Sequence, residues 1–148
     1  MPEEPAWFYK LDELVYQGYR QGMAVSLLAL NYLQSVSSGN FSFATDREFW
    51  KPKAKSADAE VDLFCVSDGV LTIGEAKKES RLGKSGSEEN LEIEKYKKLV
   101  AGLSARRLIF ATLDENWKSG TINRVTAGFR DMSHIAIEFL TAQHLHLT

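Results

Sequence analysis

Two carboxylates and a lysine flank a short turn near the middle of the chain. Asp62 precedes an Asp-Gly dipeptide at residues 68–69, and Glu75 and Lys77 follow it. Asp-Gly suits the positive φ angles of a two-residue hairpin turn. Such a turn predicts an antiparallel register that sets Asp62 opposite Glu75 and Glu60 opposite Lys77. Because alternate residues of a strand share a face, all four side chains should project to one side of the hairpin.

This arrangement of charges indicates a particular chemistry. Two facing carboxylates repel each other and destabilise a sheet unless a cation offsets them. Carboxylate oxygens suit Mg²⁺ or Mn²⁺, which retain waters and take further ligands from substrate phosphates. The ammonium of Lys77 would lie beside the same site. Metal, water and cation together are what phosphodiester hydrolysis requires.

The same four residues have a simpler interpretation as the solvated end of a hairpin. Glu60 and Lys77 would then form a surface ion pair that contributes little to stability. The neighbouring runs at 63–66 and 70–73 are apolar on both faces, as in strands inside a covered sheet. Because carboxylates at the end of a buried strand need a compensating charge, these runs favour the metal site.

The remaining chain supplies elements that would position the hairpin. Hydrophobic periodicity and turn residues predict the following order: a helix (7–34), a strand (41–46, extending toward 50), the hairpin (60–77), a mobile polar loop (80–90), a helix (91–103), a strand (107–113), a helix (120–130), a strand (135–140) and a final helical turn (141–145). This order predicts a single α/β domain over residues 1–148, a sandwich with a central mixed sheet flanked by helices.

The motif resembles that of the PD-(D/E)XK nuclease superfamily, in which an Asp opens one strand and Glu-x-Lys lies on the next. Asp62, Glu75 and Lys77 match these positions, whereas Val61 replaces the proline of the motif. The resemblance implies a restriction-endonuclease-like core of the order α-β-β-β-α-β. It also implies that Asp62 and Glu75 bind Mg²⁺ or Mn²⁺ and that Lys77 orients or activates the attacking water.

Further residues are candidates for supporting roles. Members of the superfamily often have an acidic residue or Gln on the first helix that reaches the metal, and Glu13 and Gln17 are available here. Helix capping or solvation is the competing role for both, and Glu60 is a third accessory candidate. Basic residues just beyond the second strand could contact nucleic-acid phosphates, with solvated side chains as the alternative: Lys78, Arg81 and Lys84.

The resemblance therefore implies a metal-dependent nuclease that hydrolyses phosphodiester bonds, and we expect its substrate to be DNA. The alternative is a catalytically inactive module that binds nucleic acid or assembles with proteins in a defence or repair system. A homodimer or a larger partner protein would help so small a chain hold its substrate. The single cysteine excludes an internal disulfide, and no apolar stretch reaches membrane-spanning length. We expect a cytoplasmic protein that does not contact membranes.

Overall fold

A helix, a three-stranded antiparallel unit and two further strands with their helices make up the described part of the chain. The computed structural model describes residues 23–146. In chain order the elements are α2 (Met23–Val36), β1 (Phe41–Phe49), β2 (Ala59–Ser67), β3 (Val70–Lys77), α3 (Gly86–Leu103), β4 (Arg107–Thr112), α4 (Ser119–Gly128), β5 (Ala136–Leu140) and α5 (Ala142–Leu145). This order is the predicted one. The part of the first predicted helix before residue 23 lies outside the described residues.

The strands form one five-stranded sheet in the order β1-β2-β3-β4-β5. The pairs β1–β2 and β2–β3 are antiparallel, whereas β3–β4 and β4–β5 are parallel. The predicted mixed sheet is therefore confirmed. β3, which ends in Glu75 and Lys77, is the central strand, and the direction of pairing changes across it. Its last three residues, 75–77, pair with β4 alone, because the pairing with β2 ends at Gly74.

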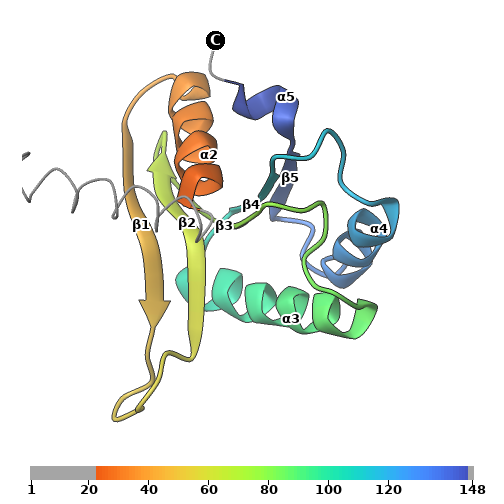
Figure 1. Ribbon diagram of the computed structural model, residues 1–148. Helices are drawn as coiled ribbons and strands as arrows, with labels where there is room; N and C mark the ends of the chain where they lie inside the picture. Colours follow the sequence, from red (N-terminus) through yellow and green to blue (C-terminus); the bar gives the residue numbers. More distant parts are fainter. Residues whose placement is uncertain (1–22, 147–148) are drawn as a thin grey trace, which may run out of the picture.

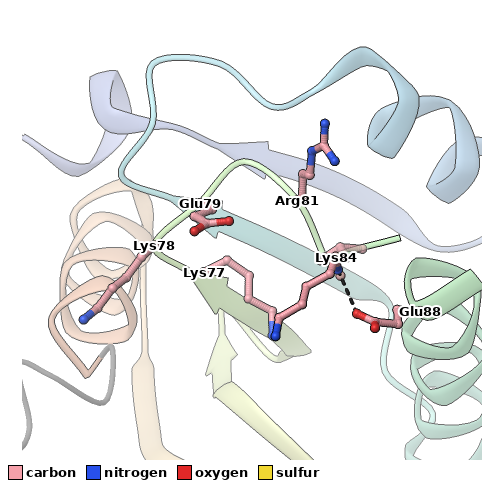
Figure 2. Close-up of a pocket in the computed structure, with 8 residues that line it drawn as sticks. Lys77, Lys78, Glu79, Arg81, Lys84 and Glu88 are labelled. Atoms are coloured by element: carbon pink, nitrogen blue, oxygen red, sulfur yellow. Dashed lines mark hydrogen bonds between the residues drawn. The ribbon is translucent and has the colours of Figure 1, made fainter. Parts of the chain in front are cut away.

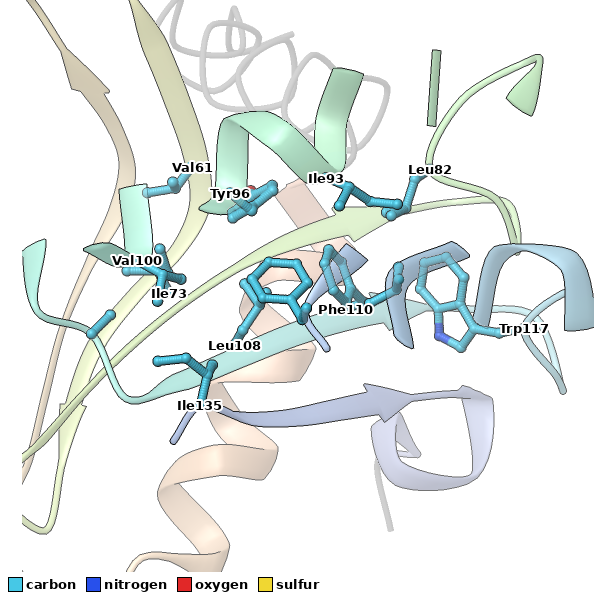
Figure 3. Packing of buried hydrophobic residues seen from close by; sticks show 13 residues of the cluster. Val61, Ile73, Leu82, Ile93, Tyr96, Val100, Leu108, Phe110, Trp117 and Ile135 are labelled. Carbon is cyan, nitrogen blue, oxygen red and sulfur yellow. The ribbon is translucent and has the colours of Figure 1, made fainter. Parts of the chain in front are cut away.

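Helices cover both faces of the sheet, which confirms the predicted sandwich (Figure 1). On one face α2 packs its helically spaced Val25, Ala29 and Leu33 against a cluster that includes Leu63 and Ile109. α5 packs beside α2 on this face. On the other face α3 and α4 enclose a larger cluster that contains aromatic rings and aliphatic side chains (Figure 3). The site residues of β3 lie in the sheet between these two layers.

The helix after β3 begins earlier than predicted. Residues 80–90 were expected to form a mobile loop, but α3 starts at Gly86. The side chain of Ser85 accepts a hydrogen bond from the backbone N–H of Glu88 at 3.3 Å, and Glu88 in turn accepts from the backbone of Lys84 at 2.8 Å. The Ser-x-x-Glu spacing is typical of the start of a helix and indicates that α3 begins here. It leaves only residues 78–85 to connect β3 with α3.

Gly74 marks a close approach between β3 and β4. A Cβ at this position would lie 2.1 Å from the carbonyl oxygen of Ile109. Gly74→Ala should therefore lower the free energy of unfolding by about 1–3 kcal/mol, because the two strands must separate to admit the methyl group. Urea denaturation measures the change. Gly102→Ala is the matched control, since nothing lies within 4 Å of its Cβ and alanine favours a helix by up to about 1 kcal/mol. Equal stability of Gly74→Ala and the parent would contradict this account of the packing.

Candidate active site

The hairpin turn fixes the register that the site depends on. Asp68 and Gly69 have φ angles of 52° and 79°, as a type I′ turn requires. The carboxylate of Asp68 accepts hydrogen bonds from the backbone N–H groups of Ser38 at 3.0 Å and Gly39 at 2.6 Å. These bonds, the one from Ser38 foremost, lower the pKa of Asp68. β2 and β3 pair in the predicted register, up to Leu63 opposite Gly74.

The ladder ends at that pair, one position before Asp62 and Glu75. In a continued ladder the backbone N–H of Ala76 would bond to the carbonyl of Val61. Instead it donates to Oδ2 of Asp62 at 2.9 Å. The carboxylate of Asp62 thus replaces a strand carbonyl at the point where β2 leaves β3. The register is confirmed by the structure, but Asp62 and Glu75 are not a paired position of the sheet.

Glu75 is buried, with 6% of its surface exposed, and donors surround its carboxylate. Lys77 Nζ lies 2.7 Å from Oε1, and Lys95 Nζ lies 3.4 Å from Oε2. The hydroxyl of Tyr96 also contacts Oε2 and lies 2.9 Å from the carbonyl oxygen of Gly74. A buried carboxylate is costly unless its charge and lone pairs are matched. Two ammonium groups and a hydroxyl meet that need here.

The contacts of Tyr96 and Lys95 with Glu75 were not predicted from the sequence, in which Lys95 is a candidate for phosphate binding. Tyr96 fits the apolar stripe of α3, and its fully buried ring packs edge-on against Phe110. Only the fold shows that its hydroxyl reaches Glu75. Burial and the charge of Glu75 raise the pKa of Tyr96 well above its usual range, so the hydroxyl remains a donor. Lys95 also forms an ion pair with Glu92 within α3 at 2.7 Å, and its contact with Glu75 links α3 to the end of β3.

Lys77 is half-buried and holds a positive charge beside Glu75. Burial alone would lower the pKa of Lys77, but the charge and hydrogen bond of Glu75 outweigh it. The charges of Glu92 and Asp62 act in the same direction, and the pKa is raised. In the structure as it stands, Lys77 is therefore an ammonium group and a hydrogen-bond donor. Its chemistry is that of a fixed cation next to the two carboxylates.

The structure describes one of the three accessory candidates, Glu60, and not the other two. Glu60 is exposed and lies opposite Glu48 of β1, and the β2–β3 ladder ends before it could face Lys77. The predicted cross-strand pairing of Glu60 with Lys77 is therefore wrong. Glu13 and Gln17 lie outside the described residues.

The three basic residues predicted to contact phosphates gather around one pocket. Lys78, Arg81 and Lys84 line a cavity of about 630 Å³ together with Lys77. In Figure 2 the connection from β3 to α3 curves around this cavity, and the side chains of Lys78 and Arg81 point away from each other. Four basic side chains and two acidic ones, those of Glu79 and Glu88, line the pocket, and one of the basic residues, Lys77, contacts Glu75. An anionic ligand in it would lie close to both Lys77 and the candidate carboxylates.

Asp62 and Glu75 are the candidate ligands for a metal ion at this site. Among residues 23–146 no group of three or more His, Cys, Asp or Glu side chains is placed to hold a metal. Mg²⁺ commonly uses one or two carboxylates and fills its other positions with water and substrate phosphate oxygens. Asp62 and Glu75 supply that smaller set.

Comparison with known proteins adds no family assignment. The chain matches no protein-family model, and no curated protein matches its sequence. Within the described part of the chain, no helix is both long enough and apolar enough to cross a membrane.

Proposed function

We propose that the chain is a metal-dependent nuclease with a restriction-endonuclease-like fold, and that it hydrolyses phosphodiester bonds in DNA. One observation carries the proposal: the buried carboxylate of Glu75, at the end of the central strand, lies beside the ammonium of Lys77, and Lys77 lines a pocket in which basic side chains outnumber acidic ones. Asp62 and Lys77 occupy the remaining positions of the Asp…Glu-x-Lys motif. The α-β-β-β-α-β order of the described elements agrees with the core that the motif implies.

Each residue has a distinct role in this proposal. Asp62 and Glu75 would hold Mg²⁺ or Mn²⁺, and Tyr96 and Lys95 are positioning residues that fix the orientation of Glu75. The bound ion would supply a Lewis acid for the phosphoryl oxygens and lower the pKa of a coordinated water. Lys77 stabilises the negative charge that develops on the phosphoryl group, because its ammonium is held in place by Glu75 before substrate arrives.

The test is cleavage of a substrate panel by the full chain with Mg²⁺, with Mn²⁺ and with a chelator. The panel holds single-stranded, duplex, flapped and branched DNA, and RNA. The blank is Asp62→Asn/Glu75→Gln, which keeps side-chain size and removes both charges. We expect metal-dependent cleavage of DNA by the parent, none by the blank, and heat of metal binding in calorimetry for the parent alone. Cleavage by the blank at the parent's rate would refute the site.

The contacts of the Glu75 carboxylate within the protein favour a second function. Lys77, Lys95 and Tyr96 already satisfy its carboxylate, so the site is stable without a metal ion. The chain would then be a catalytically inactive module of the same fold, binding nucleic acid or a partner protein. Calorimetry separates the two functions, because an inactive module of this kind gives no heat when Mg²⁺ or Mn²⁺ is titrated into the protein alone.

A further inference from the structure

A second cavity lies where α3 and α4 begin. It has a volume of about 270 Å³, and the first residues of both helices line it together with Arg81, Lys118 and Arg124. Its only carboxylate is that of Glu89, so cationic side chains outnumber anionic ones three to one among the residues that line it. The cavity is therefore electropositive, as a binding site for a phosphate group requires.

Arg124 is anchored in this cavity by a buried partner. Its NH1 atom lies 2.6 Å from Oε2 of Glu89, a residue that is 2% exposed. The other carboxylate oxygen of Glu89 accepts from the hydroxyl of Thr121 at 2.6 Å and from the backbone N–H of Leu82 at 3.3 Å. Glu89 is thus matched from within the protein. The side chain of Arg124 remains 44% exposed, which leaves its outer donors available to a ligand.

Two glycines make room for the guanidinium. A Cβ at Gly86 would lie 3.0 Å from Nε of Arg124, and a Cβ at Gly120 would lie 3.3 Å from its NH1 atom. Gly86 and Gly120 belong to the first turns of α3 and α4. Side chains at these positions would crowd Arg124 and narrow the cavity. The ion pair with Glu89 therefore holds the guanidinium of Arg124 in place. Gly86 and Gly120, which have no side chains, leave space in the cavity around it.

The second cavity adjoins the pocket at the candidate active site. Arg81 and Gly83 line both cavities. Arg81 thus connects the cavity that contains Lys77 with the cavity that contains Lys118 and Arg124. Nucleic-acid strands carry regularly spaced phosphates, and contacts to them position the strand without reading its sequence.

We propose that the cavity between α3 and α4 is a second phosphate subsite, which holds one backbone phosphate of a nucleic-acid strand while another phosphodiester of that strand lies at Lys77. Arg124 and Lys118 are the binding residues, and Arg81 bridges the two positions. The proposal rests on the proposed function for the identity of the ligand as nucleic acid. It requires no cleavage, and its test contains no metal.

The experiment is a salt titration of binding, with fluorescence anisotropy of a labelled oligonucleotide in chelator. Lys118→Ala is the variant, because the side chain is exposed and its removal leaves Glu89 and Arg124 intact. Loss of one phosphate contact should reduce the slope of log K against log salt by about 0.9 for duplex or about 0.7 for single-stranded DNA. At 0.1 M salt this corresponds to roughly a five- to eightfold loss of affinity.

Arg130→Ala is the matched control, since Arg130 is exposed just beyond the opposite end of α4. It should leave both slope and affinity unchanged. Equal slopes for Lys118→Ala and Arg130→Ala would overturn the subsite, even if the protein cleaves DNA. A reduced slope for Lys118→Ala alone would support it, even if no cleavage is found. Inorganic phosphate is the second probe, and calorimetric binding of phosphate by a chain that does not bind DNA would also overturn the proposal.

Discussion

Lys77→Met is expected to lower kcat for DNA cleavage by about 10²–10³-fold while changing KM little. The Lys77 ammonium is held 2.7 Å from Oε1 of Glu75 before any substrate binds. Preorganised positive charge at the reacting phosphoryl group stabilises the transition state more than the ground state, and the loss of one such group has effects of about this size. Methionine keeps the unbranched side chain. Lys95 and Tyr96 still match the carboxylate of Glu75, so the fold should persist.

Lys78→Met is the contrasting variant for this experiment. Lys78 is exposed and lines the same pocket, but Glu75 contacts Lys77. We expect Lys78→Met to raise KM and weaken the salt dependence, with kcat nearly unchanged, because a phosphate contact acts on the ground and transition states alike. Initial rates over a range of substrate concentrations separate the two patterns. Similar losses of kcat in both variants would argue against a special role for Lys77.

Local sequence was enough to predict the hairpin and its register. Asp68 and Gly69 specify the turn type, and a two-residue turn leaves one register for the strands on either side. The order of helices and strands also follows from periodicity, because each element carries its own apolar pattern. The early start of α3 was predictable as well, since Ser85 and Glu88 have the spacing of a helix cap.

The environment of Glu75 could not be predicted in this way. Lys95 and Tyr96 lie 20 and 21 residues away from Glu75 along the chain, and they reach it only because α3 packs across β3. In sequence, Tyr96 is one more large residue on the apolar face of a helix. The bond between Asp62 and the backbone of Ala76 depends on where β2 leaves β3, which the hairpin register does not specify. Both features are consequences of tertiary packing.

Arg124→Ala is expected to lower the free energy of unfolding by about 3 kcal/mol. Removing one partner of a buried ion pair leaves an uncompensated charge, which costs about 3–5 kcal/mol. The lower end of that range applies, because Glu89 is 2% exposed whereas Arg124 is 44% exposed and partly solvated. Urea denaturation followed by circular dichroism gives the change. The loss should be larger than that for Lys118→Ala, whose side chain is exposed.

The double variant Glu89→Gln/Arg124→Ala identifies the cause of that loss. Glutamine keeps an oxygen that can accept from Thr121 and from the backbone of Leu82, and it removes the buried charge. If the uncompensated carboxylate causes the destabilisation, the double variant will be more stable than Arg124→Ala alone. A double variant that is no more stable would assign the loss to the packing of the Arg124 guanidinium between Gly86 and Gly120. Urea denaturation reports the structural role of Arg124, whereas oligonucleotide affinity reports phosphate binding in the cavity that Arg124 lines. The two measurements therefore separate the two roles.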